Sequence, residues 1–322
     1  MLSVIIPYVN EYPQLLWTIR SIAEELTGVE FEIIVINNYC DQVKQTGFKE
    51  DDGFKVVEGS APGHSWLKSL HYKDKLSHWQ SKNLGVKHST GEFLLFVDAH
   101  VLPSRGSISD MYDFYQNKWQ TLNGTIHLPL TYKILEWRRL MYSLIAEPEI
   151  GKYYYKFSPI NDNGLKNGEK IFKPGSKVGV FETPVMSTCG CMMHRSIYDK
   201  IGGWPEELGI YGGGEPFINF TLSVMGMRKW IWTNGTLYHH GEKRGYSWNH
   251  DDWLRNDLIS SYCYGGGSLI KRKWPHVKGR PEAKKKIWDS VMGIPSIKTH
   301  RELIKSEQVM SIDEWVKPWI QT

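Results

Sequence analysis

The 322-residue sequence predicts an α/β fold with a mostly parallel sheet and helices on both faces. Short apolar strands alternate with amphipathic helices along the first third of the chain, and glycines or prolines mark their ends. Polar residues follow several of the strands directly. Ligands bind beyond the carboxyl ends of the strands in such folds, so the pattern also predicts where a functional site lies.

The first three elements form a strand, helix, strand unit. Leu2–Ile6 is a short apolar strand. Apolar residues then recur at helical spacing from Leu15 onward, and Gly28 ends the helix that this spacing predicts. Phe31–Ile36 is continuous and β-branched, which is typical of a strand covered on both faces. A parallel pair of strands joined by a helix is therefore expected at the amino end.

Two further strands are expected before residue 100. Lys55–Val57 is a candidate short strand, and a helix ending near Gly85 carries Trp79 towards the core. Gly91 then breaks the chain before the apolar run Phe93–Val97, which predicts a buried strand.

Polar residues follow three of these strands, at Pro7–Glu11, Asn37–Asp41 and Asp98–His100. We expect the three tips to meet at one crevice. Residues i and i+2 of an extended chain point to the same face, so Asp98 and His100 can converge on one cation. An Asp-x-His triplet occurs by chance about once in every two chains of this size, so its place after a buried strand carries the prediction.

Composition limits the class of protein. With 41% hydrophobic and 23% charged residues, the chain is an ordinary globular one. It contains no apolar run of about 18 residues and no basic secretion signal at its start, so we expect no integral membrane segment and a cytoplasmic location. The four cysteines have neither zinc-ribbon nor disulfide spacing and are expected to be buried thiols; they are Cys40, Cys189, Cys191 and Cys263.

The net charge of +4 is unevenly placed. Eight lysines and arginines lie between Lys271 and Lys286, against the single Glu282. This segment fits either a solvated helical surface or contact with a polyanion such as duplex DNA. Just before it, His250–Asp252 should cap an amphipathic helix that ends at Gly265–Gly267.

The chain resembles a known family. The resemblance is carried by four segments of the amino-terminal part: Ser3–Glu11, Phe31–Asp41, Ser81–Gly85 and Thr90–Asp98. They look like the nucleotide-sugar half of family 2 glycosyltransferases with the GT-A (Rossmann-like) fold. Asp98-Ala99-His100 is more similar to the Asp-x-His motif of polypeptide N-acetylgalactosaminyltransferases than to the commoner Asp-x-Asp.

The second half extends the resemblance. Segments similar to the acceptor side of these enzymes follow in order at Thr188–Arg195, Ile201–Glu206 and Tyr211–Pro216. The resemblance implies a GT-A domain over residues 1–245, with a nucleotide-sugar half (1–100) and an acceptor half (101–245). Residues 246–322 would form a helical, basic and aromatic extension. Pro216 suits the first turn of a helix, which would place Glu215 at a helix amino end facing the crevice.

The resemblance also implies roles for individual residues. The metal ligands would be Asp98, His100 and one of His239 and His240, with His240 preferred because the neighbouring Gly241 allows close approach. Residues expected to bind the donor nucleotide-sugar are Pro7, Glu11, Asn37, Asn38, Asp41, Asn83, Asp98, Arg195, Gly213 and Gly214. Tyr153–Tyr155 could stack on a sugar or a base, although packing is the commoner fate of aromatic residues.

The expected reaction moves a hexosyl or pentosyl group from a UDP-sugar to an acceptor hydroxyl. A divalent cation would neutralise the charge that develops on the leaving diphosphate. One carboxylate and imidazoles as ligands favour Mn²⁺, with Mg²⁺ as the alternative. Glu215 would be the general base of an inverting enzyme, or would orient donor or acceptor in a retaining one.

Several alternatives stay open at the sequence level. Relatives usually carry acidic residues where this chain has Asn37 and Asn38; amides both donate and accept, so uracil can still be recognised. The acceptor is either a saccharide or glycolipid, or a modified nucleic-acid base reached through Lys271–Lys286. A nucleotidyltransferase that makes a nucleotide sugar would need a glycine-rich, lysine-bearing triphosphate loop, which is missing near Pro7. A catalytically inactive nucleotide-sugar-binding protein is the remaining alternative.

Overall fold

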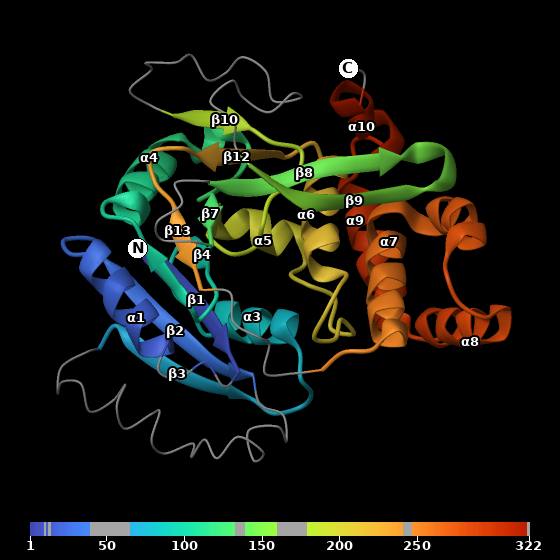
Figure 1. Cartoon of the computed structure of the whole chain (residues 1–322), viewed down its shortest axis with the longest axis horizontal. Helices are drawn as coiled ribbons and strands as arrows, with labels where there is room; N and C mark the ends of the chain where they lie inside the picture. The colour runs from blue at the N-terminus through green and yellow to red at the C-terminus, as the bar shows by residue number, and fades with distance from the viewer. Residues whose placement is uncertain are drawn as a thin grey trace.

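The computed structural model describes residues 1–9, 11, 14–38, 65–132, 139–159, 179–240 and 247–320. Three of the predictions, the strand at Lys55–Val57, the donor-binding Asp41 and the buried thiol of Cys40, fall outside the described residues. Figure 1 shows the whole chain.

The core of the described structure is a large mixed sheet. Its strands are β1 (Leu2–Tyr8), β2 (Phe31–Asn38), β3 (Leu67–Tyr72), β4 (Phe93–Phe96), β6 (Gly124–His127), β10 (Val180–Glu182), β11 (Cys191–His194) and β12 (Arg228–Trp232). They lie in the order β10-β12-β6-β11-β4-β1-β2-β3. The β4-β1-β2-β3 half is parallel throughout, whereas β11 runs antiparallel to both β4 and β6. The predicted α/β fold is confirmed, and the antiparallel strands all lie in the other half of the sheet.

Both faces of this sheet are covered by helices (Figure 1). Successive side chains of a strand point to opposite faces, so Val4 and Leu95 enter one apolar cluster while Ile5 and Phe96 enter another. The first cluster also contains residues of α1 (Gln14–Glu25) and α4 (Ser107–Leu122). The second contains residues of α3 (His78–Lys87), α5 (Arg195–Ile201) and α6 (Gly214–Val224). The continuous apolar strands of the sequence are thus explained by burial on both sides.

The buried Glu32 on β2 joins three neighbouring segments of the sheet. Its carboxylate accepts hydrogen bonds from Ser3 Oγ on β1 (2.7 Å) and from the backbone N–H groups of Thr90 (2.5 Å) and Gly91 (3.3 Å) ahead of β4. It also pairs with Lys68 Nζ on β3 at 2.6 Å. Burial alone would raise the pKa of Glu32, but Lys68 and the N–H and O–H donors outweigh it and lower the pKa to about 2.

A second, smaller sheet lies beyond the ends of the strands of the large sheet. It consists of β5 (Val101–Pro103), β7 (Leu130–Thr131), β8 (Leu140–Glu147), β9 (Lys152–Pro159) and β13 (Leu237–His239), in the order β5-β13-β7-β8-β9. β13 pairs antiparallel with β5, and this register sets His239 opposite Val101. Because Val101 directly follows His100, the pairing brings two distant parts of the chain to the same place.

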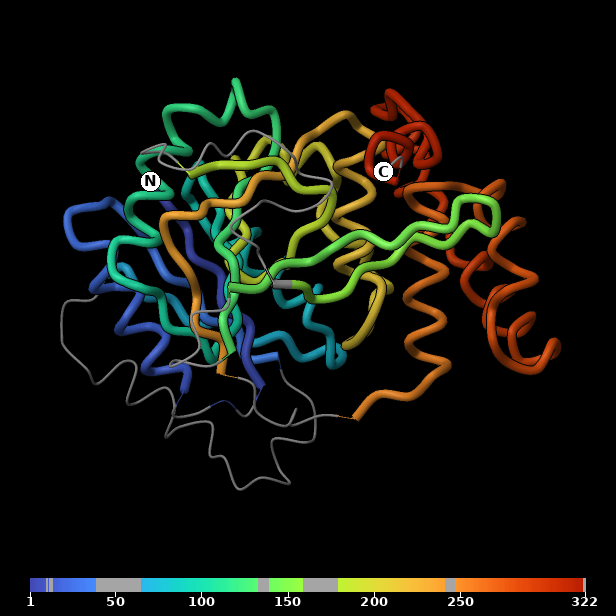
Figure 2. The backbone as a smooth tube through the Cα atoms, turned by 45° about the horizontal axis from the view of Figure 1, so that its top comes forward, coloured from blue at the N-terminus to red at the C-terminus, as the bar shows by residue number. Residues whose placement is uncertain are grey.

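The β8–β9 hairpin reaches from this sheet to the C-terminal helices, as Figure 2 shows. Its turn contains η2 (Pro148–Ile150) and Gly151, whose φ of 64° is strained for other residues. A Cβ on Gly151 would lie 3.1 Å from the Leu269 side chain, so the turn sits directly on the next helix. At the base of the turn, Tyr153 donates a hydrogen bond to Asp313, which also pairs with Arg272 at 2.7 Å.

The C-terminal part is helical, as expected for residues 246–322. Its elements are α7 (His250–Lys273), η3 (Trp274–His276), α8 (Pro281–Met292), α9 (Pro295–Glu307) and α10 (Ile312–Ile320). Asn249 caps α7 by accepting a hydrogen bond from the Asp252 N–H at 2.8 Å. The predicted helix end at Gly265–Gly267 is confirmed: Gly266 (φ 69°, ψ −167°) is non-helical, and a second helical stretch follows it to Lys273.

These helices belong to the same core as the sheet. Ile297, Ile304, Ile312 and Val316 lie in one apolar cluster with Ile5, Phe96 and α6. Across the ranges that the structure describes, no helix combines the length and the apolarity required to span a bilayer.

Candidate functional site

A cavity of about 770 Å³ lies beyond the carboxyl ends of β1, β2 and β4, where the fold predicts a ligand site. Its floor comes from the strand tips, one wall from β8 and β9, and the opposite wall from the loop before α6 and the start of α7. Of the described residues, those that carry polar or charged groups into it include Glu11, Asn38, His78, Asp98, His100, Tyr142, Tyr155, Thr188, Glu215, His239 and Asp257.

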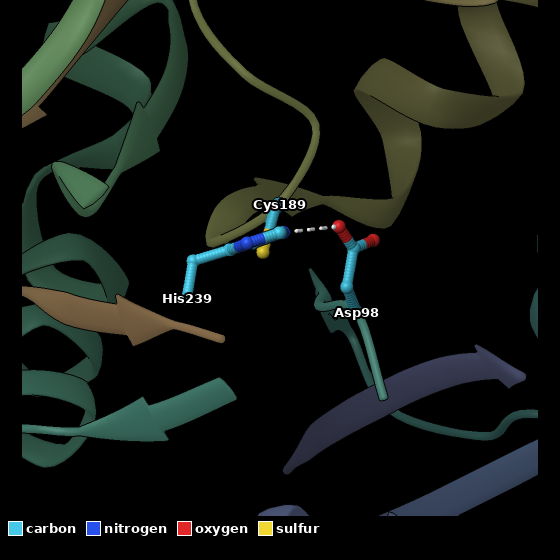
Figure 3. A group of neighbouring side chains, drawn as sticks. All are labelled: Asp98, Cys189 and His239. Atoms are coloured by element: carbon cyan, nitrogen blue, oxygen red, sulfur yellow. Dashed lines mark hydrogen bonds and ion pairs between the residues drawn. The ribbon is translucent and has the colours of Figure 1, made fainter. Parts of the chain in front are cut away.

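Asp98 and His239 are the first pair of this site. The Nε2 atom of His239 lies 3.1 Å from Oδ2 of Asp98, as Figure 3 shows. His239 reaches Asp98 because β13 pairs with β5, which begins three residues after Asp98. On the other side of the carboxylate, His78 Nε2 lies 3.7 Å from Oδ1.

His100 completes the cluster. Its Nε2 faces the Nε2 of His239 at 3.2 Å, and its Nδ1 lies 2.7 Å from Oε1 of Glu11. Glu11 is held in turn by the Val9 N–H, which donates to its Oε2 at 2.9 Å. The Nε2 atom of His239 therefore contacts both Asp98 Oδ2 and His100 Nε2, and Glu11 fixes the orientation of the His100 ring.

The electrostatics of the cluster keep Asp98 ionised. Burial by itself raises the pKa of Asp98, but the hydrogen bond with His239 and the nearby charges of His78 and Lys82 hold that pKa well below its usual range. Asp98 is therefore ionised at neutral pH. One carboxylate and two imidazoles form a ligand set that Mn²⁺ accepts, and a single carboxylate leaves room for the oxygens of a diphosphate.

Cys189 lies beside this cluster. Its Sγ atom and one ligand atom each of Asp98 and His239 lie within 4.8 Å of one another (Figure 3). Burial, and then the charge of Asp98, raise the pKa of the Cys189 thiol well above its usual value, so it stays protonated. Cys189, Cys191 and Cys263 are buried and free, which confirms the expectation of buried thiols for the described cysteines.

Glu215 stands in the first turn of α6, with both carboxylate oxygens occupied. Oε1 accepts hydrogen bonds from the Thr188 N–H (3.1 Å), from Thr188 Oγ1 (3.3 Å) and from Ser187 Oγ (3.4 Å). Oε2 accepts from the hydroxyls of Tyr142 (2.9 Å) and Tyr155 (3.1 Å). Burial and the charge of Glu215 raise the pKa of both tyrosines well above the usual value, so both remain donors. The carboxylate is held in one orientation on the cavity wall.

The two asparagines that end β2 differ in position. Asn38 lines the cavity, and its Oδ1 accepts a hydrogen bond of 3.0 Å from the Ser77 N–H at the start of α3. Asn37 is buried; its Nδ2 faces His71 Nε2 at 3.4 Å, and its Oδ1 has no hydrogen-bond partner in the described part of the chain.

The chain is similar in sequence or fold to several known glycosyltransferases. Curated N-acetylgalactosaminyltransferase 6 of Drosophila melanogaster is 22% identical over 232 residues, which is 70% of this chain and 31% of that protein. The crystal structure of GalNAc-T7 with UDP, GalNAc and Mn²⁺ superposes with a TM-score of 0.72 at 15% identity, over 98% of this chain and 56% of that one. S. aureus TarS 1–349 in complex with UDP superposes with a TM-score of 0.52 at 13% identity, over 98% and 89% of the two chains. No protein-family model matches the sequence.

This chain has the GT-A fold. The fold prediction made from the ordered segments of the sequence is therefore confirmed. This chain spans less than a third of the fruit-fly relative's length.

Gly213 and Gly214, which directly precede Glu215, allow close packing between elements of this GT-A fold. A Cβ on Gly213, whose φ is 73°, would lie 2.4 Å from the backbone oxygen of Asn256 on α7. A Cβ on Gly214 would lie 2.1 Å from the Trp79 ring. Gly213 lines the cavity, and both residues let the loop approach its neighbours closely enough to position Glu215.

Besides Asn37 and Gly214, which are absent from the cavity lining, three further residues predicted for the site lie outside it. Asn83 bonds to both backbone groups of Trp204, at 2.8 Å and 3.1 Å. Arg195 donates to the backbone oxygens of Gly91 (2.9 Å) and Val86 (3.2 Å). These two side chains join α3 and β4 to the segment around α5 in this GT-A fold.

His240 is the third of these residues. Its backbone N–H donates to the His100 carbonyl at 2.9 Å, and its Nδ1 lies 3.3 Å from the Tyr238 hydroxyl. Neighbouring residues of a strand point to opposite sides, so His239 faces Asp98 while His240 does not.

The basic segment Lys271–Lys286 also lies away from the cavity lining. Several of its charges are paired: Lys273 with Asp257 at 2.7 Å, Arg272 with Asp313, and Lys285 with Asp289 at 2.5 Å.

Sequence reasoning missed several residues of the site. Lys82 is fully buried, donates to Thr188 Oγ1 at 3.2 Å and lies 5.1 Å from the centre of a Trp79 ring. Lys82 lies three residues after Trp79 and four before Val86, so helical spacing alone places it on the core face. Tyr142 and Asp257 gave no comparable signal, because their roles depend on a hairpin and a helix that only the folded chain brings together.

Proposed function

We propose that the protein is a metal-dependent glycosyltransferase that moves a sugar from a UDP-sugar to an acceptor hydroxyl. The observation that carries this proposal is that His239 Nε2 lies 3.1 Å from Asp98 and 3.2 Å from His100 at the strand tips of a GT-A cavity. The solved neighbours that hold UDP, one of them with Mn²⁺, support the same donor class.

In this proposal Asp98 Oδ2, His100 Nε2 and His239 Nε2 hold a divalent cation, either Mn²⁺ or Mg²⁺. When bound, the cation supplies Lewis-acid stabilisation of the negative charge on the leaving diphosphate. Glu11 keeps the His100 ring in place through its 2.7 Å contact with Nδ1. The low pKa of Asp98 keeps the carboxylate ionised at neutral pH, so binding of the cation does not require the loss of a proton from it.

The nucleotide would lie over the tips of β1 and β2. Pro7 and Asn38 line this end of the cavity, and the amide of Asn38 has an N–H₂ group that can donate to a pyrimidine carbonyl. An asparagine here would recognise uracil without adding a negative charge near the diphosphate.

Glu215 would orient the reacting groups rather than remove a proton. Its two oxygens already accept from five donors, including two tyrosine hydroxyls whose own pKa values are raised. A sugar hydroxyl that enters the cavity would replace one of these donors and would donate its hydrogen bond to Glu215 from the same direction. Of the two roles expected for this residue, the structure supports the orienting one, which a retaining enzyme requires.

The proposal is tested by screening UDP-sugars for Mn²⁺-dependent release of UDP. The wild-type protein should hydrolyse at least one donor slowly without an acceptor, and Asp98→Ala should reduce that rate at least about a hundredfold. Asp289→Ala is the matched control, because this carboxylate is exposed on α8 and should leave the rate unchanged. Failure of every donor, or an Asp98→Ala variant as active as the wild type, would contradict the proposal.

A further inference from the structure

We propose that aromatic residues at the mouth of the cavity form an acceptor site for a neutral saccharide, built by the start of α7, the loop before α6 and the edge strand β9. This inference rests on the proposed transferase activity and names the class of its acceptor. Four residues, Tyr154, Tyr211, Trp248 and Trp253, are called the aromatic platform below.

Exposed aromatic side chains are concentrated at this mouth. In the described part of the chain the exposed ones are Trp17, Tyr154, Phe157, Trp248 and Trp253. Tyr154, Phe157 and Trp253 line the cavity, and Trp248 stacks on Tyr211, which also lines it. Of these five residues, only Trp17, on α1, lies away from the mouth of the cavity. Large apolar side chains that gather in the open around a cavity indicate a ligand surface.

The platform is held rigidly. The rings of Tyr211 and Trp248 stack with centroids 4.4 Å apart at 27°. A Cβ on Gly212 would lie 2.7 Å from the Trp253 ring, so the loop before α6 packs directly against it. The buried Asn256 then joins the loop to α7: its Oδ1 accepts from the Gly209 N–H at 3.0 Å, and its Nδ2 donates to the Tyr211 carbonyl at 2.7 Å. A fixed surface needs little ordering on binding, which favours affinity.

Polar groups beside the rings match the hydroxyls of a sugar. Asp257 lines the cavity one helical turn after Trp253, and Lys273 fixes its carboxylate at 2.7 Å. A pyranose presents apolar C–H faces for stacking and hydroxyls at its rim. Flat aromatic faces next to a fixed carboxylate meet both requirements.

The platform offers no cationic side chains to a polyanionic acceptor. The described lining contains the carboxylates of Glu11, Asp98, Glu215 and Asp257, against Lys156 as its one lysine or arginine. The four platform residues carry no cationic group that would pair with the phosphates of a DNA strand, so a neutral saccharide suits them better.

The platform lies at the acceptor end of the cavity. The groups proposed to hold nucleotide and cation come from the tips of β1, β2, β4 and β13. The platform comes from β9, from the loop before α6 and from the start of α7. Glu215 lines the same cavity and directly follows the Tyr211–Gly213 loop, at the start of α6. A saccharide stacked on Trp253 would thus lie next to the carboxylate proposed to orient it.

The test measures UDP release with and without added saccharide. The probes are the methyl glycosides of glucose, galactose, mannose, GlcNAc and GalNAc and of their common disaccharides, with duplex DNA as the competing acceptor. The wild-type protein should release UDP faster with at least one glycoside than with buffer. Trp253→Ala should raise the KM for that glycoside at least tenfold and lower the ratio of transfer to hydrolysis by a similar factor. Trp253→Phe should restore part of the acceptor KM and part of the ratio of transfer to hydrolysis. Trp17→Ala should change neither the KM nor this ratio.

The outcomes separate the two proposals. If the wild type hydrolyses no donor, the proposed function fails. If it hydrolyses a donor but accepts no glycoside, or transfers only to DNA, the saccharide site is overturned while the transferase activity stands. An acceptor KM that is the same for Trp253→Ala and the wild type also overturns it, with a matching melting temperature as the check that the variant folds.

Discussion

His239 lies 141 residues after Asp98 and 139 residues after His100, yet its ring contacts both side chains. The sequence predicted Asp98 and His100 from their spacing after a buried strand. It favoured His240 over His239 because of the neighbouring Gly241. The structure sets His239 beside Asp98 instead, through the pairing of β13 with β5, and pairing between distant strands is not encoded in local spacing. Single residues at strand tips were thus predictable, whereas their partners across the fold were not.

At the residue scale, the two histidines provide a matched pair of variants. His239→Ala removes a nitrogen 3.1 Å from Asp98 and should weaken Mn²⁺ binding in the presence of UDP by roughly tenfold to a hundredfold. His240→Ala removes a ring that points away from Asp98 and should leave the affinity within about threefold of wild type. Isothermal titration with Mn²⁺ distinguishes them, and a reversed order would show that His240 is the ligand.

At the scale of elements, alternation of strands and helices predicted the parallel half of the sheet. The sequence missed β3 (Leu67–Tyr72), because its residues are half-buried and lack a continuous apolar run. The β8–β9 hairpin was missed as well. Its aromatic residues line the cavity or contact the C-terminal helices, so they follow no single-face pattern. Elements that bury a single face were predictable from the sequence. Elements that pack against two different neighbours were not.

The close approach of α6 to α3 makes a prediction about Gly214. Gly214→Ala would place a Cβ 2.1 Å from the Trp79 ring and should lower the free energy of unfolding by about 1–3 kcal/mol. Gly267→Ala in α7 is the control, because a Cβ there meets nothing within 4 Å. Urea unfolding followed by circular dichroism measures both, and equal midpoints for the two variants would refute the close packing.

The strand contacts of Glu32 predict a pH dependence of stability. The pKa of Glu32 in the fold, about 2, lies below its ordinary value of 4.5, so the ionised form stabilises the native state. This contribution is complete above pH 4.5 and is lost as the pH falls towards 2. Glu32→Gln should lower the free energy of unfolding by about 1–3 kcal/mol at pH 7 and reduce its slope in that pH window.

Urea midpoints measured from pH 7 to pH 2.5 check the Glu32 prediction. Glu92→Gln serves as the control, since its side chain is 71% exposed. A Glu32→Gln variant with wild-type stability at every pH would show that the carboxylate contributes nothing to holding the strands together.

At the scale of the whole molecule, the C-terminal helices share the core of the sheet and supply one wall of the cavity. Trp253 and Asp257 of α7 enter the same space as Asp98 and Glu215. The sequence predicted helices there, and also a basic surface for a polyanion. Packing of α7 against the loop before α6 could not be predicted, because it depends on glycines that lie some forty residues before the helix. The molecule thus combines an acidic, aromatic cavity with a separate basic segment.

The central claim is that this cavity binds UDP through a divalent cation held by Asp98, His100 and His239. The most direct measurement is UDP affinity by isothermal titration with and without Mn²⁺, for the wild type and for Asp98→Ala. The account predicts that Mn²⁺ tightens UDP binding to the wild type at least about tenfold, and that Asp98→Ala abolishes this coupling. Equal UDP affinity of the wild type with and without Mn²⁺, or undiminished coupling in Asp98→Ala, would contradict it.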